Sequence, residues 1–235
     1  MALIVCRDVS LGYDGVTVCE HLNFEVNSGD YLCIVGDNGS GKSTLMKALL
    51  GLNPTLKGEI IKGEGMTVGS IGYLPQQSEL QRDFPATVRE VVLSGCVGDL
   101  GKRFFYGKAA KKLALECMEK LGISALADKP YSILSGGQQQ RTLLARALCA
   151  AKKVILLDEP VSGLDPVVAS EMYALIDSLR RKSDITVIMV THDIGAAVKY
   201  ASCVLHMGER PEFFGSVSEY RQSSAFPISR GADDE

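Results

Sequence analysis

One glycine-rich segment reads Gly36-Asp37-Asn38-Gly39-Ser40-Gly41-Lys42-Ser43-Thr44. The apolar run 31–35 precedes it and has the composition of a buried parallel strand. Leu45, Met46, Leu49 and Leu50 follow it with the spacing of the inner face of a helix. Glycines allow backbone N–H groups to point at phosphate oxygens, and the start of a helix adds partial positive charge. The pattern G-x-x-x-x-G-K-[ST], placed between a strand and a helix, therefore predicts a phosphate-binding loop for a nucleoside triphosphate.

Two side chains at the end of this loop carry specific chemistry. The Lys42 ammonium is expected to contact the β- and γ-phosphates, and the Ser43 hydroxyl to ligate Mg²⁺. A chance glycine-rich turn between a strand and a helix is the alternative reading. The Lys-Ser pair in register and the strand in front of the loop both favour the phosphate site.

Composition excludes several classes of protein. The chain has 235 residues, 46% of them hydrophobic and 23% charged, as in an ordinary globular protein. The net charge of −3 offers no basic surface for nucleic acid. The longest apolar runs, 154–157 and 185–190, are strand-sized and far shorter than a membrane span of about 20 residues. The N-terminus lacks a signal-peptide pattern, so we expect a cytoplasmic protein that reaches a membrane only through a partner.

The seven cysteines lie far apart and form no C-x-x-C motif. Most stand in apolar segments, where a thiol behaves as a small hydrophobic group, so neither a metal site nor a redox site is predicted from them. His21 and His206 are also isolated, and both are interpreted as structural.

The first third of the chain predicts strands. Residues 2–9 and 15–26 form two of them, joined by a turn at Gly12-Tyr13-Asp14-Gly15, and 58–63 and 71–76 form shorter ones. Tyr13 lies in the turn, and on these grounds alone it is a surface residue. From Gln77 to about Ala127 the residue pattern is that of helices, with a capping box at Thr87 and an apolar stripe along 110–121. This change favours a helical lobe inserted between α/β halves.

A second segment resembles an anion site. Ser135, Gly136, Gly137 and Gln138 precede the apolar helix predicted at 142–151, and a hydroxyl plus free N–H groups at a helix start would attract a phosphate. A simple helix N-cap is the alternative, and the segment alone does not decide between them.

Acidic residues follow the next buried strand. The apolar run 154–157 ends in Asp158 and Glu159, at the strand edge where open α/β sheets bind ligands. Asp158 is placed to hold Mg²⁺ and Glu159 to polarise an attacking water. His192 follows the strand predicted at 185–190, at the same edge of the sheet, and is interpreted as a γ-phosphate contact.

Taken in order, these motifs resemble those of the ATP-binding subunits of ABC transporters. The likeness covers residues 2–220 and implies an α/β fold of the P-loop NTPase, ABC-type ATPase class. In that fold a mostly parallel core sheet is joined to an N-terminal antiparallel β subdomain and an inserted helical subdomain. We expect one domain over 1–235, with its core at roughly 1–76 and 151–220, the helical signature subdomain at roughly 77–150, and a loose tail at roughly 222–235.

The resemblance also implies roles for individual residues. Two copies would pair head to tail, with each ATP lying between the phosphate loop of one copy and Ser135, Gly136, Gly137 and Gln138 of the other. Tyr13 matches the aromatic residue that stacks on adenine, which replaces its interpretation as a surface residue. Gln76 matches the glutamine that senses Mg²⁺ and water, Glu159 the general base, and His192 the γ-phosphate switch. Asp165 matches the loop that crosses the dimer.

Within this family, the segments 73–77 and 84–95 are similar to subunits that serve importers of zinc, manganese or iron-type metals. This likeness implies a transmembrane permease as partner, and indirectly an extracytoplasmic metal-binding protein, with the chain peripheral on the inner face of the membrane. A non-transport ABC ATPase acting on a soluble scaffold, as in iron–sulfur cluster assembly, keeps every catalytic residue and stays open. A small-molecule phosphotransferase is disfavoured by the signature at Ser135.

Overall fold

The computed structural model describes residues 1–13, 16–76, 85–99, 105–208 and 211–227. It has one three-stranded sheet, one six-stranded sheet, and helices that cover both faces of the larger sheet. The predicted α/β class is therefore confirmed.

The smaller sheet is antiparallel throughout, with the order β2-β1-β4. Its strands are β1 (Ala2–Tyr13), β2 (Val16–Asn27) and β4 (Lys57–Lys62). The predicted hairpin is present, but its strands run further into the turn, because Gly12 pairs with Thr17 and Tyr13 with Val16. Asp14 and Gly15, at the tip of the predicted turn, lie outside the described residues.

The larger sheet has the order β5-β6-β7-β3-β8-β9, and all of its strands are parallel except the edge strand β9. Its strands are β3 (Tyr31–Gly36), β5 (Ile71–Leu74), β6 (Val154–Asp158), β7 (Thr186–Val190), β8 (Cys203–Met207) and β9 (Pro211–Ser216). All five residues of β6 and of β7 are buried. These strands read as continuous apolar runs because parallel strands are covered on both faces.

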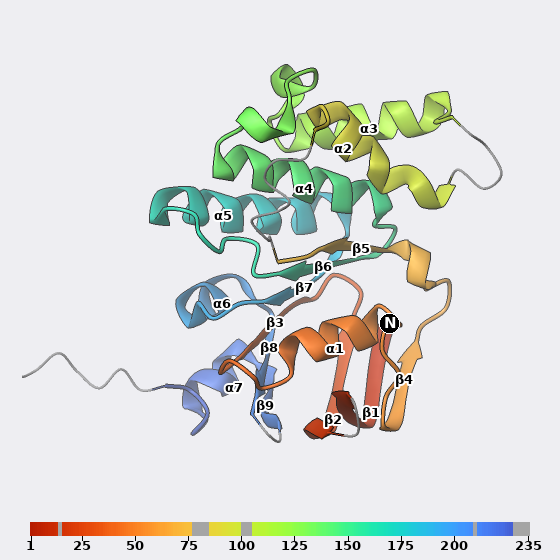
Figure 1. Ribbon diagram of the computed structural model, residues 1–235. Coiled ribbons are helices and arrows are strands. Elements are labelled where there is room, and N and C mark those ends of the chain that lie inside the picture. Colours follow the sequence, from red (N-terminus) through yellow and green to blue (C-terminus); the bar gives the residue numbers. More distant parts are fainter. Residues whose placement is uncertain (14–15, 77–84, 100–104, 209–210, 228–235) are drawn as a thin grey trace, which may run out of the picture.

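Two hydrophobic cores flank this sheet, and Figure 1 shows the layers. Helix α1 (Lys42–Leu49) and the antiparallel sheet pack on one face. Helices α4 (Gly136–Ala150), α5 (Pro166–Ser183) and α6 (Ile194–Tyr200) pack on the other. Alternate residues of a strand such as β3 therefore belong to different cores: Tyr31 and Cys33 to one, Leu32 and Ile34 to the other.

The segment predicted to be helical contains α2 (Val88–Leu93), a 3₁₀ turn (Ser94–Asp99) and α3 (Lys108–Lys120). The capping box at Thr87 is confirmed: its side chain accepts from the Glu90 N–H, and Glu90 accepts from the Thr87 N–H in return. The expected start of the next helix at residue 142 is wrong, because α4 already begins at Gly136. Ser135 caps that helix, so the two glycines form its first turn.

The last described segment packs more tightly than the sequence predicted. Helix α7 (Val217–Gln222) carries the fully buried Tyr220, and the Phe226 ring contacts its edge at 5.4 Å between centroids. Ala225 and Phe226, which lie in the stretch expected to be a loose tail, therefore pack against the core. Residues 228–235 lie outside the described part of the chain.

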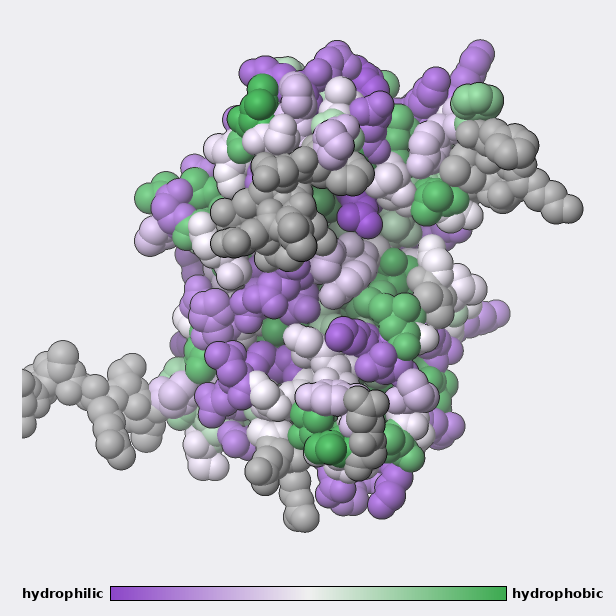
Figure 2. All heavy atoms as spheres, in the orientation of Figure 1, coloured by the Kyte–Doolittle hydropathy of each residue, from purple (hydrophilic) through white to green (hydrophobic). Residues whose placement is uncertain are grey.

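Surface properties follow from this layering. Within the described ranges, no helix combines the length and the hydrophobicity needed to cross a membrane. Figure 2 shows several separate hydrophobic patches among hydrophilic side chains on one face, instead of a single apolar band. Among the described residues, the most exposed large hydrophobic side chains are Phe105, Met1 and Val167, which come from different parts of the chain.

Candidate active site

Three strands bring the candidate residues to one edge of the larger sheet. The phosphate loop follows β3, the two acidic residues stand at the end of β6, and His192 follows β7, which lies between these two strands. The carboxyl ends of parallel strands meet at one edge, so segments far apart in sequence become neighbours. A cavity of about 220 Å³ opens there, lined by Tyr13, Val18, Asn38, Gly39, Gly41, Lys42, Ser43, Thr44, Gln76, Glu159 and Val190.

Glycines are required in the phosphate loop. Gly36, Gly39 and Gly41 have φ values of +141°, +86° and +93°, a region that side-chain-bearing residues rarely adopt. A Cβ on Gly36 would stand 2.1 Å from the Met207 carbonyl oxygen, so β8 also excludes a side chain there. Helix α1 starts without a side-chain cap. Its first N–H groups are therefore available to an anion.

Two polar side chains of the loop are buried. The Lys42 ammonium donates to the carbonyl oxygens of Gly36 at 2.8 Å and Asp37 at 2.6 Å. Burial lowers the Lys42 pKa, although the neighbouring carboxylates of Glu159, Asp37 and Asp158 oppose this shift. The Ser40 hydroxyl oxygen is buried and has no hydrogen-bond partner among the described residues. A buried hydroxyl without a partner is uncommon in native structures, and this one lies in the segment predicted to bind phosphate.

Beside the loop, Asp158 is 5% exposed, and burial raises the pKa of its carboxyl group. The charge of Glu159 raises it further, whereas Lys42 and Lys47 lower it. The Glu159 backbone has a φ of +47°, in the left-handed region that is costly for a residue with a side chain. Its N–H is fixed by the Val190 carbonyl at 3.0 Å. Strain of this kind is concentrated at functional sites.

Side chains from the ends of two neighbouring strands, β5 and β7, approach the Glu159 carboxylate at the end of β6. The Gln76 amide Nε2 donates to Glu159 Oε2 at 3.3 Å, and His192 Nδ1 lies 3.8 Å from Oε1. This arrangement places a candidate general base between an amide and an imidazole. The Ser43 hydroxyl, the Gln76 amide and the Asp158 carboxylate supply the oxygen donors that Mg²⁺ prefers, so the donor set fits that ion.

Tyr13 lines the same cavity and is largely exposed, at 58%. Val18 and Val190 also line the cavity, and the sequence did not identify them. Neither residue has a signal of its own, because a valine in a strand is far more often a packing residue.

The Ser135 segment has the geometry of an N-cap. The Ser135 hydroxyl accepts from the Gln138 N–H at 3.4 Å, and the Gln138 side chain accepts from the Ser135 N–H at 3.2 Å. Gly136 and Gly137 face the start of α5: a Cβ on Gly137 would stand 2.7 Å from the Val168 side chain. Asp165 caps that helix by accepting from two N–H groups at 3.1 Å each. None of these residues is among those that line the cavity of the phosphate loop.

The remaining histidines and cysteines make structural contacts. His206 Nδ1 lies 2.9 Å from the Tyr220 hydroxyl, and His21 Nδ1 lies 2.7 Å from Asp8. Six of the seven thiols are buried and the seventh, Cys203, is partly buried. Over the described residues, no group of three or more His, Cys, Asp or Glu side chains is placed to hold a metal ion.

Comparison with known proteins places these observations in a family. Residues 19–162 match the family model described as ABC transporter. The zinc import ATP-binding protein ZnuC 1 of Hahella chejuensis is 37% identical over 192 residues, which cover 82% of this chain and 69% of that protein. The manganese transport system ATP-binding protein MntB of Bacillus subtilis is 36% identical over 211 residues, covering 88% and 84%.

Solved structures agree with this result. The structure of cbiO1 from Clostridium perfringens, part of the ABC transporter complex cbiONQ, superposes with a TM-score of 0.82 at 30% identity. The match covers 94% of this chain and 91% of that one.

Proposed function

Because this chain belongs to the ABC transporter family of ATP-binding subunits, which hydrolyse ATP, we propose that it powers the import of a zinc- or manganese-type cation. The observation that carries the choice of cargo is the likeness to zinc and manganese import subunits over more than four-fifths of the chain. The alternative of a soluble-scaffold ATPase gains no support from these relatives. The cation would be cargo of the membrane partner, since this chain supplies the hydrolysis.

The cavity at the sheet edge is the ATP site in this proposal. Backbone N–H groups of 36–44 and the Lys42 ammonium bind the phosphates, and the exposed Tyr13 ring stacks on the adenine. Ser43, Gln76 and Asp158 hold Mg²⁺, which supplies charge neutralisation of the phosphates when bound. Glu159 accepts a proton from the attacking water, and the His192 imidazole contacts the γ-phosphate. The Gln76 and His192 side chains already lie against Glu159, which supports their assignment to one reaction.

A second copy of the chain completes the site. Ser135–Gln138 and Asp165 lie outside the cavity of their own chain, yet they combine helix-start N–H groups with a hydroxyl. We assign them to the ATP held by a partner copy in a head-to-tail homodimer. ATP favours the closed pair because only that state provides both sets of contacts. Hydrolysis removes the γ-phosphate and reopens the pair.

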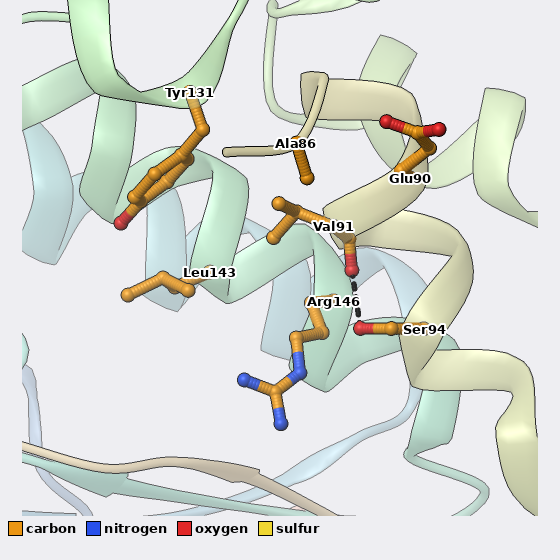
Figure 3. Close-up of a pocket in the computed structure, with 7 residues that line it drawn as sticks. All are labelled: Ala86, Glu90, Val91, Ser94, Tyr131, Leu143 and Arg146. Atoms are coloured by element: carbon orange, nitrogen blue, oxygen red, sulfur yellow. Dashed lines mark hydrogen bonds between the residues drawn. The ribbon is translucent and has the colours of Figure 1, made fainter. Parts of the chain in front are cut away.

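The permease has a candidate docking groove on the helical side of the molecule. A cavity of about 460 Å³ is lined by Ala86, Glu90, Val91, Ser94, Tyr131, Leu143 and Arg146 (Figure 3). Val91, Leu143 and the Tyr131 ring form an apolar wall, and the Arg146 side chain lines the same cavity. This combination fits a short amphipathic helix of the permease that carries an acidic residue. The groove adjoins α2, and the segment 77–84 before it leads back to Gln76.

Filling this groove tests the docking step. Ala86→Trp places an indole at its rim and should abolish co-purification with the permease while leaving ATP binding intact. Ala109→Trp, on the exposed surface of α3 and outside the groove, is the matched control. Retained co-purification of Ala86→Trp would place the permease elsewhere.

The transport step is tested in the native cell by replacing the chain with Glu159→Gln. We expect this variant to bind ATP, to hydrolyse it at least a hundredfold more slowly, and to accumulate as a dimer. Uptake of radioactive zinc or manganese should fall with hydrolysis, and Glu116→Gln on α3 should have no effect. Unchanged hydrolysis would contradict the role of Glu159. Lost hydrolysis with normal uptake of both metals would contradict the proposal that this chain powers zinc or manganese import.

A further inference from the structure

The His192 ring, the proposed γ-phosphate contact, is held more by its backbone than by packing. Its side chain is 67% exposed, and its Nδ1 lies 3.8 Å from Glu159 Oε1. A side chain that acts on a substrate must be held within about 0.5 Å of its working position. An exposed ring receives little of this support from its neighbours, so its direction depends on the backbone conformation at residue 192.

The backbone at His192 forms a turn that the preceding residue closes. The Thr191 hydroxyl accepts from the Asp193 N–H at 3.0 Å, so His192 is the central residue of the turn. The Thr191 N–H donates to the Ile34 carbonyl of β3 at 3.1 Å. The Asp193 carboxylate accepts from the Ala196 N–H at 2.9 Å and caps α6. The backbone is therefore anchored to β3 before His192 and to α6 after it.

A tyrosine of α5 holds the Thr191 hydroxyl in this turn. A hydrogen bond of 3.2 Å joins the Tyr173 and Thr191 hydroxyls, and the two residues are only 3% and 1% exposed. A threonine oxygen both donates and accepts, so it can bond to the Asp193 N–H and to Tyr173 at once. The Tyr173 ring also stacks on Tyr200 of α6, with 5.8 Å between centroids and 26° between planes. Packing thus fixes the ring, and the hydrogen bond joins its hydroxyl to the turn.

We propose that Tyr173 is a positioning residue for His192, because its hydroxyl fixes the Thr191 side chain and with it the turn that directs the imidazole toward the γ-phosphate. Tyr173 is not among the residues that line the cavity of the phosphate loop, so it acts through Thr191 and His192. Without the phenol hydroxyl, the Thr191 hydroxyl keeps one partner of this pair, and its other rotamers become more populated. This inference rests on the proposed role of His192 in ATP hydrolysis.

Steady-state ATP hydrolysis by the full-length chain measures the effect on the reaction. In Tyr173→Phe we expect kcat to fall about tenfold, since a small misplacement of a reacting group can cost roughly a hundredfold. KM for ATP should stay at the wild-type value, because the phosphate loop is unchanged. Thr191→Val removes the other hydroxyl and should show the same pattern, whereas Thr191→Ser keeps it and should retain most of the wild-type kcat. Tyr200→Phe is the matched control, because it removes the hydroxyl of the stacked ring and leaves the Tyr173–Thr191 bond in place.

Nuclear magnetic resonance separates a positioning role from a general effect on the fold. The chain has three histidines, His21, His192 and His206, so labelling with ¹³C-histidine gives three ring signals. In Tyr173→Phe the His192 signal should shift, while those of His21 and His206 stay in place. A wild-type kcat, an unchanged His192 signal, or shifts of all three signals would overturn the positioning role.

A further variant, His192→Ala, tests the premise separately. If it hydrolysed ATP at the wild-type rate, the proposed role of His192 would be wrong, and this inference with it. If it were inactive while Tyr173→Phe behaved as wild type, only the role of Tyr173 would be wrong.

Discussion

Removing the Ser40 hydroxyl should change stability and ATP binding in opposite directions. This hydroxyl oxygen is buried in the phosphate loop without a hydrogen-bond partner among the described residues. A buried unpaired hydroxyl costs about 1–3 kcal/mol. Ser40→Ala should therefore raise the free energy of unfolding of the nucleotide-free protein by about 1 kcal/mol, which corresponds to a melting temperature about 2–4 °C higher for a chain of this size.

The same substitution should weaken ATP binding. A phosphate oxygen that accepted from this hydroxyl would lose one hydrogen bond, worth about 0.5–1.5 kcal/mol, so the Kd should rise roughly two- to tenfold.

Thermal unfolding without nucleotide and equilibrium ATP binding in EDTA measure these two quantities. Ser70→Ala is the matched control, because the Ser70 hydroxyl is buried but donates to the Thr67 carbonyl at 2.7 Å. The control should lower the melting temperature and leave the Kd unchanged. A Ser40→Ala protein that is less stable than wild type and binds ATP equally well would show that the hydroxyl neither destabilises the empty loop nor contacts a phosphate.

Three further changes test other parts of the structure. Asp165→Ala removes the cap of α5 and should cost about 1 kcal/mol of unfolding free energy, whereas Asp165→Asn should keep most of it. Denaturant titration would show this difference, and equal losses would contradict the capping role. Gly72→Ala places a Cβ 2.1 Å from the Ala147 carbonyl oxygen, so it should lower the unfolding free energy by about 1–3 kcal/mol in a denaturant titration. If the variant were as stable as wild type, β5 and α4 would be able to move apart to make room for the added methyl group. Burial raises the pKa of Cys6 from 9.0 to about 12, so the folded state holds its proton more tightly than the unfolded chain. The stabilisation that comes from this raised pKa is complete below pH 9 and is lost as the pH rises toward 12. In Cys6→Ala, the unfolding free energy should therefore decrease less between these two pH values than it does in wild type.

Local patterns in the sequence predicted much of the fold. The phosphate loop, the hairpin, the capping box at Thr87 and the acidic end of β6 all depend on residues that are close together in the chain. Backbone conformation and capping are short-range effects, so neighbouring residues carry them. Where such a pattern was ambiguous, the predicted start of a helix was wrong. Ser135 satisfied both the cap and the anion interpretation, and the start of α4 was therefore placed too late.

The assembly of the site depended on the tertiary structure. The order β5-β6-β7-β3 places His192 and Gln76 on either side of Glu159, and no short-range pattern specifies that order. Val18 and Phe226 look like ordinary strand or tail residues, because their roles arise from neighbours that are distant in sequence. The order of residues along the chain specifies which chemical groups are present and which local conformations hold them. Only the folded sheet decided which groups meet, because side-chain contacts between strands depend on pairing and register.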